Sequence, residues 1–476
     1  MNIGFIALFN NTIFYKAIAD ELEKDGHSIF WITSSKKRKT WLINNGTLAE
    51  KIVLLNKSVL NVQIIEKGKQ LINEIERKTN EKVNNIILMD RILRHWNYRS
   101  ACEYVYSISN TINEFLLKND IEIVISEGTT VQELITAILC KYNNKNFYNP
   151  GTMRIPSDRF LFFKGYLQKE YEKFEEFDSN STRDLSERVE EIKIGVRSGV
   201  KPNYFYWNDQ IPKINISWFS KVIEKIKESL IESRNDATVK SLGYHLFKEP
   251  KYLKPFRYFR ARSLFEKPDL ETKYALYTMH MQPESGIDVF GAKTSNQLDV
   301  IEKISRELPV DMVLYVKEHS NCLGDRSVSY LKAIQRLPGV KLIDPFFSTH
   351  KLIERCQIVF TICGTVGFEA GFFGKKTVLF SQMYFDGLSS VISIINSNQI
   401  STILKKESEE FTAEDKLFIE NMLNNSFEGI ISDPISAPIC ISDENLKRVS
   451  FAFRKLIDLI QNRNECTNKK QMLNED

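Results

Sequence analysis

Short apolar runs alternate with helix-like segments over the first 150 residues of the chain. Strands are expected at Ile3–Leu8 and Ser28–Thr33, with a helix from Tyr15 to Lys24 between them that Gly26 ends. The same alternation then predicts, in order, a helix at 105–116, a strand at 121–126, a helix at 131–142 and a strand at 146–148. Residues 55–100 indicate charged helices outside the sheet. The pattern predicts a parallel α/β layer.

The pattern changes between 166 and 268, where Lys- and Glu-rich helical stretches such as 166–177 and 218–230 predict a helical insertion and linker. Its last part, Lys251–Lys267, places basic residues among aromatic ones, which favours contact with anionic lipid or an acidic acceptor. The alternative is a solvated helix face beside a hinge. The basic residues are Lys251, Lys254, Arg257, Arg260, Arg262 and Lys267.

The stretch Tyr274–Phe380 has the most regular pattern in the chain. Leu298, Ile301, Ile304 and Leu308 mark one face of a helix, before which Thr294 and Gln297 have the spacing of a capping box. Strands are expected at 274–279, 312–316, 341–343, 358–362 and 377–380. A second doubly wound domain is therefore predicted.

With 476 residues, the chain is too long for one hydrophobic core, so two Rossmann-like α/β domains are expected. The terminal segment reads as an amphipathic helix followed by a polar tail. The expected parts are an N-terminal domain at 1–165, a helical insertion and linker at 166–268, a C-terminal domain at 269–442, a helix at 443–461 and a disordered tail at 462–476.

Composition excludes some classes of partner. The 65 basic side chains nearly balance the 61 acidic ones, so the net charge of +4 predicts no nucleic-acid partner. The seven cysteines have no CxxC spacing, which suits a reducing compartment. The chain shows no signal peptide and no apolar run long enough to span a bilayer. We expect a cytoplasmic protein that can touch the inner membrane peripherally.

The strongest chemical signal lies in residues 362–380. Gly364, Thr365 and Gly367 open a helix directly after a strand, so its free N–H groups and dipole predict a phosphate seat. Glu369 follows one turn later and could accept hydrogen bonds from ribose or sugar hydroxyls. Alternatively, the glycines only let the helix pack tightly against the sheet. Ligands of open α/β sheets bind at this end of the strands, which favours the binding interpretation.

Two further motifs end on the same predicted edge. The motif VKEHS places Lys317 and His319 at this edge. Lys317 would supply a fixed positive charge for phosphate, and His319 a hydrogen-bond donor that can act as an acid; the alternative is that a lone His is structural. MHMQPESG offers Gln282 and Glu284; Glu284 is a candidate catalytic carboxylate or merely part of a turn and cap.

The N-terminal half carries its own candidates. Glu127 follows a strand directly and could deprotonate an acceptor hydroxyl, or it could only cap the next helix. Arg154 and Arg159 could bind an acidic substrate group or be surface charges. No HExxH, CxxC or DxD-like pair demands a metal, and no GxSxG, Walker or GxGxxG motif is present.

In this order, the motifs EGTT, QPE, VKEH and GTVGFEAGFFGKKTV resemble those of capsule and lipopolysaccharide biosynthesis glycosyltransferases, in particular the group that includes the capsular β-Kdo transferases. The similarity covers residues 120–165 and 274–395. His319-Ser320 departs from the His-Pro pair frequent in such proteins, and the insertion before 268 has no counterpart.

The resemblance implies a GT-B fold, with two Rossmann-like domains facing a cleft and a terminal helix that crosses back to the first. It implies no cofactor, no obligatory metal, a nucleotide-sugar donor such as CMP-Kdo or another CMP or UDP sugar, and a surface glycan or glycolipid acceptor. Carried onto this chain, the resemblance implies that Lys317, His319, Thr365 and Glu369 hold the donor and that Glu127 and Glu284 are the candidates for acid/base or nucleophile. Together with the residues argued above, the predicted catalytic residues are Glu127, Glu284 and His319; the predicted donor-binding residues are Gln282, Lys317, His319, Gly364, Thr365, Gly367 and Glu369; the predicted acceptor-binding residues are Asn10, Asn11, Arg154 and Arg159.

Two other functions fit the same pattern. A nucleotide-sugar 2-epimerase has a similar fold and a similar glycine–Glu helix, and it would turn over donor without acceptor. A non-catalytic polysaccharide-binding or export subunit would bind nucleotide weakly or not at all.

Overall fold

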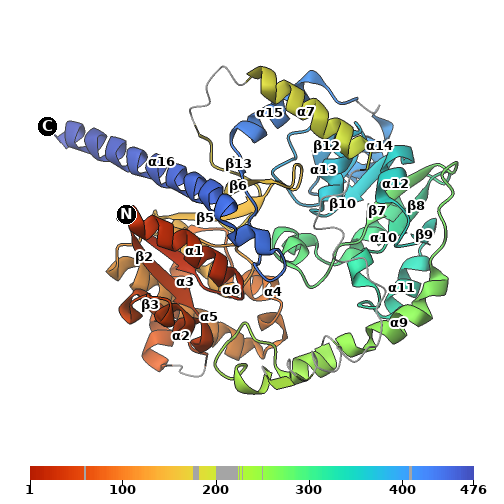
Figure 1. Ribbon diagram of the computed structural model, residues 1–476. Helices are drawn as coiled ribbons and strands as arrows, with labels where there is room; N and C mark the ends of the chain where they lie inside the picture. The colour runs from red at the N-terminus through yellow and green to blue at the C-terminus, as the bar shows by residue number, and fades with distance from the viewer. Residues whose placement is uncertain are drawn as a thin grey trace. The chain divides into compact units, whose positions relative to one another are not determined.

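The computed structural model describes residues 1–57, 61–174, 182–199, 223, 226–227, 229–248, 250–406 and 410–475 (Figure 1). The chain forms two compact units. The first contains Met1–Phe177, Ile231–Val239 and Leu423–Asp476; the second contains Asp178–Leu230 and Lys240–Met422. The expected helical stretch at 218–230 lies mostly outside the described residues.

The first unit is built on a sheet of order β13-β6-β5-β4-β1-β2-β3. Strands β1 to β5 are parallel, and β6 and β13 add antiparallel at one edge. The strands are β1 Asn2–Ile6, β2 Ser28–Thr33, β3 Ile52–Leu54, β4 Ile123–Ile125, β5 Asn146–Thr152, β6 Arg159–Lys164 and β13 Phe427–Glu428. Chain order reverses between β1 and β4, which is where ligands bind in such sheets.

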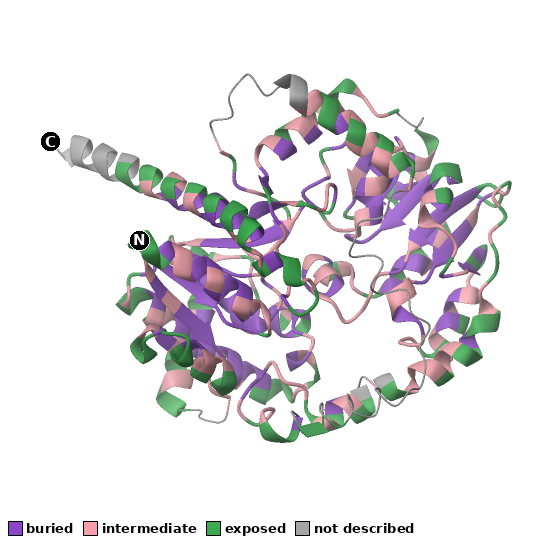
Figure 2. Cartoon of the chain, viewed as in Figure 1, coloured by how far each residue is buried: buried purple, intermediate pink, exposed green. Residues whose placement is uncertain are grey.

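Helices cover this sheet, whose strands are almost wholly buried (Figure 2). The helices are α1 Asn11–Lys24, α2 Lys36–Asn44, α3 Val62–Lys78, α4 Val83–Met89, α5 Tyr98–Lys118, α6 Val131–Tyr142 and α16 Asp443–Glu475, with 3₁₀ turns at Ala49–Lys51, Leu93–His95 and Pro438–Ile441. Of the charged helices expected at 55–100, α3 is charged, whereas α4 contains no charged residue and is largely buried. Gly68 lets α3 approach α5, because a Cβ there would lie 1.8 Å from the carbonyl oxygen of Tyr106.

The C-terminal segment belongs to this first unit. Residues 423–442 were expected in the C-terminal domain, but β13 pairs with β6, and Val449, Phe453 and Leu456 of α16 are buried in the N-terminal core. Helix α16 also continues to Glu475, past the expected end at 461 and through the segment expected to be disordered.

The second unit has a wholly parallel sheet of order β12-β11-β10-β7-β8-β9. The strands are β7 Tyr274–Thr278, β8 Val313–Lys317, β9 Val340–Ile343, β10 Ile358–Thr361, β11 Thr377–Leu379 and β12 Val391–Ser393. This is the doubly wound order, with its reversal between β7 and β10. Two Rossmann-like units in one chain confirm the predicted α/β fold class of the GT-B type.

The helices of the second unit lie around that sheet. They are α7 Thr182–Arg197, α9 Lys254–Ala261, α10 Gln297–Glu307, α11 Val328–Gln335, α12 Thr349–Arg355, α13 Thr365–Phe372, α14 Gln399–Lys405 and α15 Ala413–Asn424, with π-helical turns at Tyr244–Lys248 and Gly286–Phe290 and 3₁₀ turns at Lys251–Leu253, Arg262–Leu264, Ala292–Thr294 and Ser320–Cys322. Among the described residues, no helix is both long and apolar enough to cross a membrane.

Two local predictions differ from the structure. Residues 166–174 are not helical, because Tyr171 bridges Phe163 and the buried Glu172 carboxylate accepts hydrogen bonds from Tyr148 and Arg463. Asn296, not Thr294, caps α10. Gln297 cannot serve that cap, because its side chain is buried against the loop after β7.

Candidate functional site

The predicted donor-binding residues lie at the carboxyl ends of β7, β8 and β10, either in the loops there or in α13, the helix that follows the loop after β10. Because parallel strands end at the same edge of a sheet, the loops meet at the reversal of chain order. Gln282 and Glu284 follow β7, Lys317 ends β8 and His319 follows it, and Gly364 follows β10. The structure therefore brings these sequence motifs to one edge.

The start of α13 is open to an anion. Gly364 occupies the N-cap position and contributes no side-chain cap. The backbone N–H groups of Thr365 and Val366 and the Thr365 hydroxyl have no hydrogen-bond partner among the described residues. Unsatisfied N–H groups at the positive end of a helix attract phosphate. Glu369 is half-buried one turn further along α13.

The two predicted glycines do different things. A Cβ on Gly367 would lie 3.0 Å from Cδ2 of Leu379 and 3.2 Å from Cγ2 of Thr361, so this glycine lets α13 pack on the sheet. A Cβ on Gly364 would lie 2.7 Å from Oγ1 of Thr361 and 3.0 Å from Cε1 of His280. The packing alternative thus describes Gly367, whereas Gly364 makes room for a histidine at the edge.

His280 was not singled out from the sequence, although it follows the buried strand β7 directly. Its Nε2 accepts a hydrogen bond from the backbone N–H of Ile362 at 3.2 Å and lies 3.1 Å from Oγ1 of Thr361. Burial, with the charges of Arg326 and His319, lowers the pKa of His280 to about 3. The ring is therefore neutral, and because Nε2 accepts, its proton is on Nδ1. Nδ1 is bonded to the ring atom Cε1, beside Gly364.

Gln297 fixes the backbone of His280. The His280 N–H donates to Oε1 of Gln297 at 2.7 Å, and Nε2 of Gln297 donates back to the His280 carbonyl at 3.2 Å. Gln282 is held in the same network: its amide nitrogen donates to Asp288 at 3.1 Å and to the carbonyl of Ser295 at 3.3 Å. The Gln282 side chain therefore shapes the loop.

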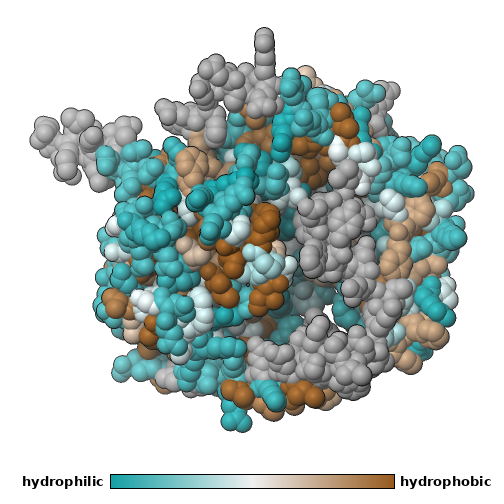
Figure 3. Space-filling model, in the orientation of Figure 1, coloured by the Kyte–Doolittle hydropathy of each residue, from teal (hydrophilic) through white to brown (hydrophobic). Residues whose placement is uncertain are grey.

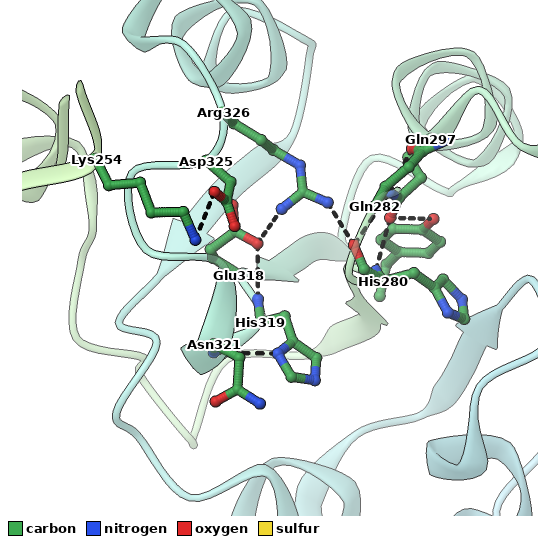
Figure 4. Close-up of polar contacts among 10 residues, drawn as sticks. Lys254, His280, Gln282, Gln297, Glu318, His319, Asn321, Asp325 and Arg326 are labelled. Atoms are coloured by element: carbon green, nitrogen blue, oxygen red, sulfur yellow. Dashed lines mark hydrogen bonds and ion pairs between the residues drawn. The ribbon is translucent and has the colours of Figure 1, made fainter. Parts of the chain in front are cut away.

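A buried ion pair joins the loops after β7 and β8. Arg326 pairs with Glu318, which is 2% exposed, and donates to the carbonyl of His280 (Figure 4). Burial raises the pKa of the Glu318 carboxyl, against the lowering effect of Arg326. Glu318 also accepts the backbone N–H of His319 at 2.8 Å. The sequence motif VKEH contains Glu318, but nothing in the sequence pointed to its partner.

The other predicted donor residues take different orientations. Lys317 is 7% exposed, and its Nζ donates to the carbonyl of Pro345 at 2.7 Å, so its ammonium already has a structural contact. Nδ1 of His319 accepts the N–H of Asn321 at 3.1 Å, so the ring proton is on Nε2. The thiol of Cys363 donates to the carbonyl of Gly286 at 2.9 Å, so the loop that carries Glu284 reaches the start of α13. Burial raises the pKa of that thiol, and the charge of Glu284 adds to the rise.

The first unit has a second cluster of polar residues, which lies where the strand order of its sheet reverses, between β1 and β4. The amide of Asn11, the first residue of α1, donates to the carboxylate of Glu127, which follows β4. Asn10 accepts from Arg38 at 2.7 Å and donates to Asp433 at 3.4 Å. Arg38 and Asp433 come from distant segments, and no sequence motif marked them.

Glu127 has the properties of a base that works near neutral pH. Burial, and next the charge of Glu133, raise its pKa to about 7, while Asn11 and Arg91 act in the opposite direction. The capping role that was the alternative for Glu127 is filled by Glu133, which accepts the backbone N–H groups of Thr129 at 2.7 Å and Thr130 at 2.9 Å. Glu127 is therefore not needed as the cap of α6.

The two predicted arginines differ. Arg154 is exposed in the loop after β5, at the same sheet edge as Glu127. Arg159 instead donates to the hydroxyl and the carbonyl of Ser426, both at 2.7 Å, and so ties β6 to the segment before β13. Arg159 therefore holds two segments of the first unit together and does not belong to the cluster of polar residues around Glu127. No cluster of three or more His, Cys, Asp or Glu that could hold a metal occurs among the described residues.

Comparison with known proteins agrees with the resemblance seen in the motifs. Residues 256–399, less than a third of the chain, match the family of capsule polysaccharide biosynthesis proteins. This match includes β7, β8, β10 and α13. The predicted resemblance to capsule biosynthesis glycosyltransferases is thereby confirmed. No curated protein shows a significant match to the chain.

Several solved structures are similar at low identity. A UDP-GlcNAc 2-epimerase from Methanocaldococcus jannaschii is 13% identical over 89% of this chain and 99% of its own, with a TM-score of 0.25. For KpsC of Thermosulfurimonas dismutans, the beta Kdo 2,7 transferase is 12% identical over 73% of this chain and 88% of its own, with a TM-score of 0.34. Its beta Kdo 2,4 transferase is 12% identical over 65% and 82%, with a TM-score of 0.35.

Proposed function

We propose that this protein is a glycosyltransferase that moves a sugar from a nucleotide-sugar donor to a growing surface polysaccharide or glycolipid. One observation carries the proposal: the family match to capsule polysaccharide biosynthesis proteins covers the residues that form the open start of α13 and its surroundings. CMP-Kdo or another CMP or UDP sugar is the proposed donor.

The donor phosphate would bind at the start of α13. The N–H groups of Thr365 and Val366 would hold its oxygens, and the Nδ1–H of His280 would add a neutral donor beside them. Glu369 would accept hydrogen bonds from hydroxyls of the ribose or sugar, and His319 offers Nε2–H as a donor. Lys317 and Gln282 would contribute by holding the loops around the donor in shape, since their side chains bind other parts of the protein.

In the transfer, the bond between the sugar and the donor phosphate breaks as the acceptor oxygen forms the new glycosidic bond. Glu127 would take the proton of the acceptor hydroxyl, for which a pKa of about 7 is suited. The donors at the start of α13 would stabilise the charge that develops on the leaving phosphate. Glu284, which lies near that helix start, remains the second candidate carboxylate.

The acceptor would lie on the first unit. Asn10 and Asn11 line its sheet edge beside Glu127, and Arg154 is exposed at the same edge. These groups match a hydroxyl-rich glycan that carries acidic groups.

Purified protein incubated with a panel of UDP-, GDP- and CMP-sugars, with and without glycan acceptors, tests the proposal. Consumption of one donor that depends on acceptor is the expected result. Turnover of donor without acceptor would instead indicate an epimerase. Binding without any turnover, or no binding at all, would indicate a non-catalytic subunit.

A further inference from the structure

Helix α9 of the second unit has two opposite faces. Its inner residues follow the spacing of one helix face, and they are Lys254, Arg257, Tyr258 and Ala261. Lys254 forms an ion pair with Asp325 at 2.6 Å, and Arg257 donates to the carbonyl of Asp325 at 3.2 Å. Two of the six basic residues noted in the sequence are therefore used to fasten the helix.

Close backbone packing holds α9 in this orientation. Gly324 has a φ of +78°, and a Cβ there would lie only 2.1 Å from the carbonyl oxygen of Lys254. Ala261 is 2% exposed. The inner face is thus firmly anchored, and the outer face cannot turn inward.

The outer face is aromatic. Tyr252, Phe256 and Phe259 are spaced by four and three residues, and 44%, 60% and 61% of their respective surfaces are exposed. On the side shown in Figure 3, apolar residues form small groups on a mostly hydrophilic surface. Exposed aromatic side chains that line one helix face mark an interaction surface.

Basic side chains flank this aromatic face. The guanidinium of Arg262 lies 4.2 Å from the ring centre of Phe259, and that of Arg260 lies 5.5 Å from the ring centre of Phe256. Both arginines are exposed, as is Lys267 further along. A face that combines aromatic rings with cations fits the boundary of an anionic bilayer, where rings enter the interface and cations meet lipid phosphates.

We propose that the outer face of α9, formed by Tyr252, Phe256, Phe259, Arg260 and Arg262, docks on an anionic lipid bilayer. Charge complementarity favours an anionic bilayer as the partner, because the face carries two arginines and contains no acidic residue that would bind a basic partner. Such docking would hold the protein at a membrane that carries a lipid-linked glycan. Lipid binding is independent of the donor chemistry, so it can be tested whether or not transfer is observed.

Co-sedimentation of the full chain with vesicles tests this docking. The protein should bind vesicles that contain phosphatidylglycerol, bind pure phosphatidylcholine weakly, and lose binding in 0.5 M salt, where the Debye length falls to roughly 4 Å and charges are strongly screened. Phe256→Ser with Phe259→Ser should lower the partition coefficient at least about tenfold. Arg260→Ser with Arg262→Ser should lower it about 25-fold, since each cation near such a surface contributes about fivefold.

Phe451 of α16 provides the matched control. It is 54% exposed, and Nζ of Lys455 lies 5.6 Å from the centre of its ring, so it reproduces an exposed aromatic–cation pair outside α9. Phe451→Ser should bind vesicles like the wild type, and unchanged thermal unfolding should show that every variant is folded. The proposal is overturned if the wild type does not bind the anionic vesicles, or if Phe256→Ser with Phe259→Ser binds them equally well. A change in oligomeric mass without vesicle binding would instead assign the face to a second copy of the chain.

Discussion

The ion pair between Glu318 and Arg326 should be a main support of the candidate donor edge. Among the described residues, Glu318 is the only one whose carboxylate pairs with the Arg326 guanidinium, and Glu318→Gln removes that carboxylate. Arg326 then stays charged, because an arginine does not lose its proton in a protein. Arg326→Met leaves the opposite problem, a buried Glu318 without its cation.

The burial of both groups sets the expected size of the effect. The Glu318 side chain is 2% exposed and that of Arg326 is 11% exposed, and breaking a buried pair costs about 3–5 kcal/mol. Arg326 keeps its hydrogen bond to the carbonyl of His280, so we expect the lower value, about 3 kcal/mol, for Glu318→Gln. For a domain of this size, that corresponds to a fall in Tm of roughly 6–12 °C.

Scanning calorimetry of the two single variants and the double variant measures this coupling. The double variant should be less destabilised than the sum of the single variants, by about 1–3 kcal/mol. The loss in Arg326→Met should be smaller at pH 5 than at pH 8, because burial already raises the Glu318 pKa and protonation removes the unpaired charge. Glu302→Gln with Arg306→Met breaks an exposed pair of α10 and should change Tm by no more than about 2 °C. Additive effects of the single variants would refute the buried pair.

Three further perturbations follow from the structure. Glu127→Gln should lower the transfer rate about 10²–10⁴-fold and abolish the rise of that rate with pH near 7, measured in steady-state assays. The free energy of unfolding of the wild type should fall as pH increases from about 4.5 to about 7, because the folded state keeps the proton of Glu127 to a higher pH than the unfolded state does. The variant should lack the part of this fall that Glu127 causes. Gly324→Ala should destabilise the second unit by about 1–3 kcal/mol and increase hydrogen exchange in α9, because its Cβ would meet the Lys254 carbonyl at 2.1 Å. His280→Phe should weaken nucleotide binding about tenfold, measured by titration calorimetry, since it removes one hydrogen-bond donor, and it should also lower the Tm, since the buried N–H of Ile362 loses its acceptor; equal affinity would remove His280 from the site.

Local patterns were sufficient for most of the sheet. The strand at 28–33 and the helix at 131–142 have the predicted bounds, and the five strands predicted in the second unit shift by one residue at most at either end, because buried apolar runs and helical periodicity are properties of short windows. Strands β3, β6 and β12 were not predicted. Strand β13 was missed because it has two residues and forms only by pairing with β6, more than 260 positions earlier. No local window contains that partner.

In the candidate site too, local patterns predicted some features, and contacts between distant segments decide the others. The edge that carries Thr365 and Glu369 follows from strand order, which alternation along the chain indicates. What a predicted side chain does depends on partners from distant segments: Lys317 donates to the carbonyl of Pro345, and Arg159, in the first unit, donates to Ser426. Hydrogen bonds between distant segments decide whether a polar residue faces a ligand or holds a loop. The sequence therefore predicted where the motifs lie in the fold better than it predicted the contacts of each side chain.

Nucleotide binding to the start of α13 tests the central claim most directly. Titration calorimetry with CMP, UDP and GDP should show that the wild type binds at least one of them, and Glu369→Ala should weaken that binding at least about tenfold. Glu414→Ala, which changes an exposed glutamate of α15 in the same unit, should leave the affinity unchanged. Equal affinity of Glu369→Ala and the wild type, or no binding of any nucleotide by the wild type, would contradict a donor site at this edge.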